Sequence, residues 1–341
     1  MPAPVKSQSA WKSGPSKKLI QSPIRGPLMR TRRLMAGVLI ILMIFGLLSC
    51  RGRRYHGGEN TNHFEFMFEG MERSYELYVP NRLRPNPGVL FVLHGGGGDP
   101  EKMMGLTYGA FDELADRHGF LVVYPAGVEN QWNDGREIPE SKAHSEKLND
   151  TGFLLAIQDR LKKDYGISRT YFTGISNGGF MSFRMGCEHP DRVDGIAPVT
   201  ANLSVYLQDR CNPRGVPILL MNGTEDPLVP YDGGYVEVLG KKRGAIRSTD
   251  DSIRRWLTAN GCAVPADLNS ALAETIDEKD DETVARVLRF PCSVNVELIR
   301  IEGGGHTWPS GRPYLFEFLV GRVSQEIDAS SRIVQFFGLD G

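Results

Sequence analysis

Short apolar runs recur along the chain, and each stops at glycine, proline or a polar turn. The clearest occupy residues 89–93, 120–124, 171–173 and 216–221. Residues 294–301 alternate apolar and polar positions, and residues 75–79 suggest an edge strand that stops at Pro80. Short apolar runs bounded by turn residues are typical of strands buried on both faces of a parallel sheet.

Segments with helical spacing lie between these runs. They are residues 110–118, 153–165, 251–260 and 330–337. In the second, Phe153, Ile157 and Leu161 share one face, and Gly261 follows the third as a candidate left-handed cap. Alternation of strand and helix predicts an α/β fold with a mostly parallel central sheet and helices on both faces. Functional loops of such sheets gather at the carboxyl ends of the strands.

Two segments interrupt the alternation. Residues 263–289 are acidic and lie between Cys262 and Cys292, so we expect an inserted surface excursion. Residues 51–62 are polar and glycine-rich, as a flexible tether would be. The catalytic domain is therefore expected to span residues 63–341, and residues 1–50 to form an N-terminal extension.

The N-terminal extension has the features of an export signal. Three arginines between residues 30 and 33 precede a charge-free run over residues 34–48, which is too short for a membrane-spanning helix. The run ends in LLSC, similar to a bacterial lipobox with Cys50 as the lipidated residue, although Leu48 stands where a smaller residue is usual. The alternative is a short uncleaved anchor. Residues 1–28 would make an unusually long leader, so we expect translation to start at Met29.

Charge and cysteine content narrow the class of protein. Without residues 1–50 the chain has nine more acidic than basic residues, which argues against nucleic-acid binding. The other four cysteines suit two disulfides in an oxidising compartment. Sequence proximity favours Cys187 with Cys211 and Cys262 with Cys292, although three connectivities and buried free thiols are possible. No cysteine or histidine spacing resembles a zinc site, and no metal or cofactor is expected.

The sequence GISNG at residues 174–178 matches the G-x-S-x-G nucleophile pattern around Ser176. A strand pattern precedes it and a helix pattern over residues 180–186 follows it, as the sharp strand-to-helix turn of this motif requires. The alternative is a glycine-rich turn with a solvated serine.

A serine nucleophile needs a base, and the base needs a carboxylate. His306 follows the 294–301 strand on the loop GGGHTW and is the candidate base, with His94 as its rival. Asp226 follows the 216–221 strand and is the candidate carboxylate, with Glu225 and Asp232 as alternatives. The chain order Ser, Asp, His is the order of α/β-hydrolases.

The oxyanion and the substrate need further groups. The backbone N–H of Asn177 is one expected oxyanion donor, and Gly96 or Gly97 supplies the second. A phosphate-binding loop is rejected because no Gly-Lys-Ser/Thr follows the four glycines. Trp132, Trp308 and Tyr231 lie on loops after strands, where they are candidates to line a substrate pocket, with core packing as the alternative for the tryptophans.

With these residues in place, the chain resembles the poly(3-hydroxybutyrate) depolymerase/feruloyl esterase family of α/β-hydrolases. The matching stretches are residues 93–98, 150–154, 173–179, 222–230 and 303–309, and the resemblance extends from about residue 75 to the end. Asn149 and Asn222 depart from the usual pattern, and no appended substrate-binding domain is visible.

The resemblance implies Ser176, Asp226 and His306 as a triad, an acyl-enzyme and secretion. It predicts a serine ester hydrolase acting on hydroxyalkanoate oligoesters. Feruloyl or acetylxylan esters on plant polysaccharide are the alternative substrates. An inactive surface lipoprotein that binds a ligand in a hydrolase-shaped cleft is the alternative of another class. The sequence does not determine the oligomeric state.

Overall fold

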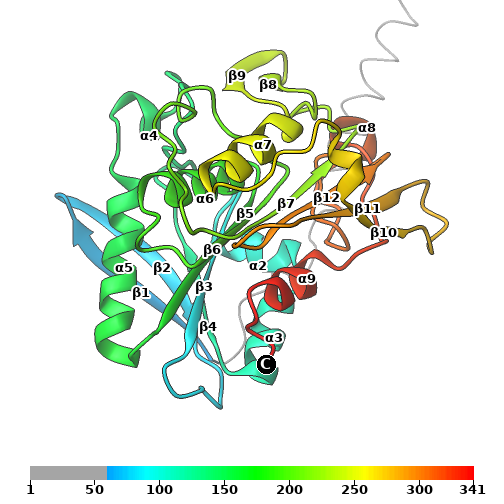
Figure 1. The fold of residues 1–341 in the computed structure, drawn as a ribbon. Helices are drawn as coiled ribbons and strands as arrows, with labels where there is room; N and C mark the ends of the chain where they lie inside the picture. The colour runs from blue at the N-terminus through cyan, green and yellow to red at the C-terminus, as the bar shows by residue number, and fades with distance from the viewer. Residues whose placement is uncertain (1–59) are drawn as a thin grey trace, which may run out of the picture. The chain divides into compact units, whose positions relative to one another are not determined.

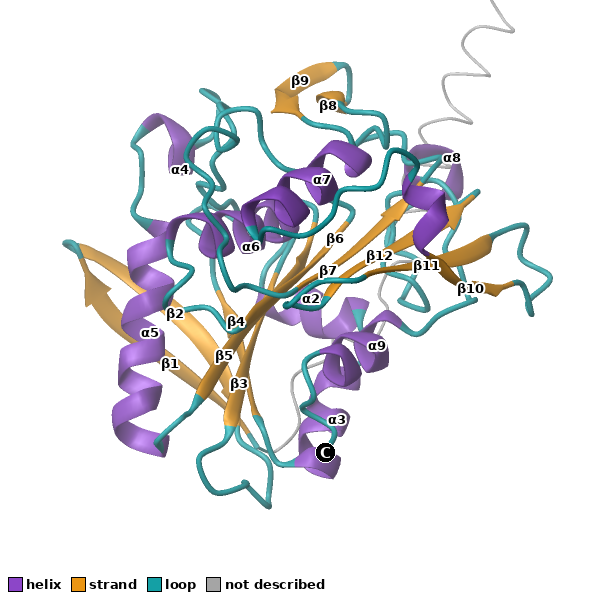
Figure 2. Cartoon of the chain, viewed as in Figure 1, coloured by secondary structure: helices purple, strands orange, loops and turns teal. Residues whose placement is uncertain are grey.

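The computed structural model describes residues 60–341, which form a ten-stranded sheet with helices on both faces (Figures 1 and 2). In spatial order the strands are β1 (Thr61–Phe68), β2 (Met71–Tyr78), β4 (Leu121–Pro125), β3 (Gly88–Leu93), β5 (Arg169–Ile175), β6 (Gly195–Val199), β7 (Ile218–Gly223), β12 (Val296–Glu302), β11 (Val284–Phe290) and β10 (Leu272–Ile276). A separate hairpin comprises β8 (Gly234–Val238) and β9 (Lys241–Ile246). This is the α/β-hydrolase fold.

Two helical layers bury opposite faces of the sheet. One contains α5 (Asp150–Tyr165), α6 (Asn177–Glu188) and α7 (Thr249–Ala259), and the other contains α2 (Pro100–Leu106), α3 (Ala110–His118) and α9 (Ala329–Phe336). Along β3, Phe91 belongs to the first core, whereas Leu90 and Val92 belong to the second. A strand covered on both faces needs apolar residues at every position, which explains the continuous runs. The remaining helices are α4 (Lys142–Ser145), η1 (Leu268–Ala271) and α8 (Glu317–Val320).

Side-chain and glycine caps set the ends of these helices. The Asn149 carboxamide accepts the Gly152 N–H at 3.0 Å at the start of α5, and Gly166 ends that helix in the left-handed region. Ser248 caps α7, and Gly261 has a φ of +67° just beyond its end, as predicted. These local signals explain why the helix boundaries are close to those expected from sequence.

Strand direction defines two edges of the sheet. The strands β4, β3, β5, β6, β7 and β12 pair in parallel, so their carboxyl ends all meet at one edge, here called the catalytic edge. Strand β2 runs antiparallel to β4, and Thr61 of β1 pairs with Tyr78 of β2, opposite Val122 near the start of β4. Thr61 therefore lies at the other edge, remote from the loops that follow the parallel strands.

Three expectations about the chain need correction. The strand around residues 75–79 is not the edge, because β1 pairs outside it. Residues 263–289 are not only a surface excursion, because β10 and most of β11 fall within them and extend the central sheet with buried residues such as Val287. The tether cannot extend to residue 62, because β1 begins at Thr61. The leader, Met29 and Cys50 lie outside the described residues.

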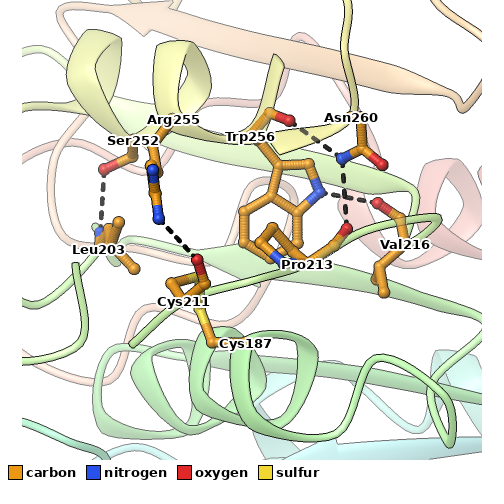
Figure 3. The surroundings of a disulfide bond; sticks show 9 residues. All are labelled: Cys187, Leu203, Cys211, Pro213, Val216, Ser252, Arg255, Trp256 and Asn260. Carbon is orange, nitrogen blue, oxygen red and sulfur yellow. Dashed lines mark hydrogen bonds between the residues drawn. A yellow bond between two sulfur atoms is a disulfide. The ribbon is translucent and has the colours of Figure 1, made fainter. Parts of the chain in front are cut away.

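Two disulfides join Cys187 to Cys211 and Cys262 to Cys292, the pairing that sequence proximity favoured. The first lies beneath α7, where the Trp256 indole donates to the Val216 carbonyl at 2.7 Å and Arg255 donates to the Cys211 carbonyl at 2.8 Å (Figure 3). Because Cys187 lies in the last turn of α6, this disulfide fixes the far end of the helix that follows Ser176. Within residues 60–341, no helix is both long and apolar enough to cross a membrane.

Candidate active site

Ser176 occupies the turn between β5 and α6 with a strained backbone. Its φ is +53° and its ψ is −117°, and its N–H donates to the Val199 carbonyl at 2.9 Å. A Cβ on Gly174 would lie 2.5 Å from the Leu93 carbonyl oxygen, and one on Gly178 would lie 2.2 Å from it. Glycine is required at both positions because α6 packs so closely on β3. This is the geometry that projects a nucleophilic serine from the catalytic edge.

His306 and Asp226 form a buried pair on neighbouring loops. The Nδ1 of His306 lies 2.7 Å from Oδ2 of Asp226, and the other oxygen of Asp226 accepts the N–H groups of Leu228 and Val229 at 2.8 Å each. A carboxylate in this position only accepts, so Nδ1 carries the ring proton. The lone pair of Nε2 is then available to take a proton.

The loop that carries His306 is held by a second segment. The His306 N–H donates to the Val320 carbonyl at 2.5 Å, and the Tyr314 hydroxyl donates to the His306 carbonyl at 2.7 Å. A Cβ on Gly305 would lie 2.2 Å from the Val320 oxygen, which explains one of the three glycines before the histidine.

The fold brings these three residues to the catalytic edge. Ser176 follows β5, Asp226 follows β7 and His306 follows β12, with only β6 between the first two strands and none between the last two. No hydrogen bond joins the Ser176 hydroxyl to His306 among residues 60–341. Catalytic hydrogen bonds often tighten only when substrate is bound, so the triad remains a prediction that this arrangement supports.

His94 is excluded as the rival base by its hydrogen bonds. Its Nδ1 lies 2.8 Å from the Gly95 carbonyl and its Nε2 accepts the Gly127 N–H at 2.9 Å, so both ring nitrogens are engaged. Burial lowers the pKa of His94 to about 4, which keeps the ring neutral. His94 therefore joins the glycine loop to the segment after β4.

The alternative carboxylates do not contact the base. Glu225 is exposed and pairs with Arg322 at 3.2 Å, and Asp232 is exposed. Asp226 alone of the three hydrogen-bonds to His306.

The hydrogen bonds in the structure distinguish between the candidate oxyanion donors. The Gly97 N–H already donates to the Asn130 carbonyl at 2.8 Å, so Gly97 is the weaker candidate and Gly96 remains. The Asn177 N–H lies in the first turn of α6, where backbone donors have no partner within the helix. Asn177 and Gly96 are therefore the proposed oxyanion donors.

Sequence reasoning missed a buried network behind the nucleophile. The Asn177 side chain accepts the Trp132 N–H at 2.8 Å and donates to Asp134 at 2.5 Å. Burial alone would raise the pKa of Asp134, but the guanidinium of Arg136, 2.6 Å away, and the nearby His144 lower it. Asp134 is therefore an anion that fixes the start of α6. The two-residue spacing of Asp134 and Arg136 was the available signal, but it is also common in exposed turns.

Two of the three pocket candidates prove to be core residues. Trp132 is fully buried and donates its indole N–H to the His94 carbonyl at 3.0 Å. Trp308 is also buried and donates to the Ser330 hydroxyl at 3.1 Å. Both tryptophans support loops from behind, so the pocket expectation is wrong for them. Tyr231 stays partly exposed, with its hydroxyl 3.2 Å from Asp250.

Comparisons with known proteins place the chain among esterases. It is 27% identical over 299 residues to the putative esterase NocK of Nocardia uniformis subsp. tsuyamanensis, covering 83% of this chain and 84% of that protein. It is 31% identical over 167 residues to the bifunctional acetylxylan esterase/xylanase XynS20E of Neocallimastix patriciarum, covering 48% of this chain but 23% of that longer enzyme. No family model matches the chain.

A solved structure supports the fold. The acetyl xylan esterase from Aspergillus awamori superposes with a TM-score of 0.54 at 14% identity, covering 82% of this chain and 99% of that one. This structural likeness concerns the fold alone, and the sequence relatives supply the link to esterases. The chain is thus an esterase of α/β-hydrolase fold, and the proteins whose sequences it resembles include feruloyl and acetylxylan esterases.

Proposed function

We propose that this esterase hydrolyses carboxylic esters through Ser176, His306 and Asp226. The Nε2 of His306 removes the Ser176 proton as the hydroxyl oxygen attacks the ester carbonyl, and Asp226 holds the imidazole in the required tautomer. The N–H groups of Asn177 and Gly96 stabilise the oxyanion. The imidazolium then gives its proton to the leaving alcohol, and water hydrolyses the acyl-enzyme by the same route.

One observation carries this proposal. The buried His306–Asp226 pair, 2.7 Å apart, lies at the same sheet edge as the strained turn at Ser176. A histidine oriented by a carboxylate, at the same sheet edge as a serine on such a turn, is the arrangement expected to activate a hydroxyl.

Acyl esters on plant polysaccharide are the proposed substrates. The relatives include proteins named feruloyl esterase and acetylxylan esterase, and their names support this class over the hydroxyalkanoate oligoesters expected first. Hydrolysis of acetylated and feruloylated xylan, measured beside hydroxybutyrate oligomers, decides between the two substrate classes.

Replacement of the nucleophile tests the mechanism. Ser176→Ala should lower kcat for p-nitrophenyl acetate by several orders of magnitude and abolish covalent labelling by a fluorophosphonate, with an unchanged circular dichroism spectrum. A wild-type protein that neither labels nor turns over esters would instead support the inactive ligand-binding lipoprotein.

We infer that the protein works outside the cytoplasm. Two disulfides support an oxidising compartment. Lipidation at Cys50 remains a proposal, and the mass of the N-terminal peptide from membranes tests both the lipid and the start at Met29.

A further inference from the structure

An exposed apolar segment lies beside the candidate base. Residues 314–319, here called the aromatic strap, run from Tyr314 into α8. Phe316 is 67% exposed and Phe318 is 80% exposed, and their rings stack 5.6 Å apart at an interplanar angle of 14°. Leu315 and Leu319 are also exposed. Contiguous apolar surface of this kind marks an interaction site more often than a single exposed residue does.

The aromatic strap is attached directly to the loop that carries His306. Its first residue, Tyr314, donates to the His306 carbonyl, and Val320, the residue after the strap, accepts the His306 N–H. The same two segments are also joined by an isolated parallel β-bridge between Gly304 and Arg322. The strap therefore extends the active site on the side of the base.

The proposed mechanism determines which half of the ester lies next to the loop that carries His306. In the proposed reaction His306 gives its proton to the leaving alcohol, so the alcohol part of the ester lies next to the histidine loop. In an acylated polysaccharide the alcohol part is the sugar chain.

The rim of the strap carries carboxylates. Arg322 contacts Glu225 at 3.2 Å, Glu282 at 2.6 Å and Glu317 at 3.6 Å, and all three glutamates are more than 60% exposed. One guanidinium thus pairs with three carboxylates, so the rim has a net negative charge and exposed carboxylate oxygens that can accept hydrogen bonds. Such a rim repels an anionic lipid surface. A polyester chain has ester carbonyl acceptors but no hydrogen-bond donors along its length, so it would desolvate these carboxylates without donating hydrogen bonds to them.

We propose that the aromatic strap binds the pyranose chain of the acylated polysaccharide. A pyranose ring has an apolar C–H face that packs on an aromatic ring, and its hydroxyls donate hydrogen bonds to carboxylates. The stacked Phe316 and Phe318 provide the first surface, and Glu225, Glu282 and Glu317 provide the second. This proposal rests on the ester hydrolysis proposed above and assigns the sugar side of its substrate.

The test compares the double variant Phe316→Ala/Phe318→Ala with Met67→Ala, a 65% exposed residue of β1 outside the strap. Affinity electrophoresis in gels containing unacylated xylan measures binding without chemistry. The double variant should bind xylan about five- to tenfold more weakly, as expected for lost aromatic contacts, and Met67→Ala should bind normally. The kcat/KM of the double variant for p-nitrophenyl acetate should stay within about twofold of wild type.

Three results for the double variant would overturn the strap proposal. They are unchanged binding to xylan, a loss of kcat/KM for p-nitrophenyl acetate as large as the loss of xylan binding, or a loss seen only in the hydrolysis of tributyrin emulsions. The last would indicate an apolar surface as partner. A wild type that hydrolyses p-nitrophenyl acetate but does not bind xylan refutes the strap and leaves ester hydrolysis standing. A wild type that binds xylan but hydrolyses no ester refutes the hydrolase instead.

Discussion

Asp226→Asn is the change that most directly tests the orientation of His306. The substitution keeps the shape of the side chain but replaces one oxygen with an NH2 group. In the wild type, Oδ1 accepts two backbone N–H groups and Oδ2 faces His306 Nδ1. The asparagine must therefore point its NH2 group either at two donors or at the histidine.

The structure allows the cost of each orientation to be compared. An NH2 group turned toward Leu228 and Val229 leaves two N–H donors without an acceptor, at about 1–3 kcal/mol each. We therefore expect the NH2 group to face His306 and donate to Nδ1. The ring proton then moves to Nε2, which can no longer accept the Ser176 proton.

Restoring the productive tautomer requires turning the amide, which costs about 2–6 kcal/mol from those two bonds. At about 1.36 kcal/mol for each factor of ten, kcat should fall by about 1.5 to 4.5 orders of magnitude. KM for a small ester should change little, because Asp226 does not touch the substrate.

The assay is steady-state hydrolysis of p-nitrophenyl acetate at pH 7.5, with urea denaturation to confirm that the variant is folded. Asp232→Asn is the matched control, since Asp232 is an exposed aspartate on the same loop. If Asp226→Asn kept more than a tenth of wild-type kcat, or if Asp232→Asn lost as much, the reasoning about the tautomer would be wrong.

Three further predictions concern the support of the site. Asn177→Ala removes a buried side chain that bonds Trp132 and Asp134, so the free energy of unfolding in urea should fall by about 2–4 kcal/mol; a loss below 1 kcal/mol would contradict the network's role. The pKa of His94 is about 4 in the folded chain against its ordinary 6.5, so the unfolded chain binds more protons between these values. Stability should therefore rise by about 3 kcal/mol from pH 4 to 6.5, relative to a His94→Gln variant whose pH profile serves as baseline; parallel profiles would refute this. Replacing Cys187 and Cys211 together by serine should lower the free energy of unfolding by about 3.5 kcal/mol, because the unfolded chain gains conformational entropy without the disulfide. The kcat at 25 °C should stay near that of wild type. A folded variant with an unchanged urea midpoint would contradict this prediction.

The parallel core of the fold was predictable because its strands are buried on both faces. Residues 89–93 form an apolar run that lies in β3, and all but the first residue of the run 120–124 lie in β4. Strand β6 was missed because it has five residues and contains Pro198, which is unusual in a central strand. Strand β10 was missed because an edge strand with four of its five residues exposed carries little hydrophobic signal.

The candidate triad was predictable because each member follows a strand and chain order restricts the choice. The supporting residues were not. Trp132 gave no sign in sequence that its indole would bond the backbone of His94, since that contact depends on tertiary packing. The strap was overlooked because residues 314–319 look like any short apolar run, and only their exposure distinguishes them from core.

The position of Thr61 has a practical consequence. Because β1 starts at the edge opposite the loops after β5, β7 and β12, a group coupled directly at Thr61 would meet the domain on its remote side. A resin, a surface or a fused partner module attached at Thr61 should therefore leave the hydrolytic face accessible. Immobilised preparations coupled at this end should keep access to bulky polymers that coupling through α8 would obstruct.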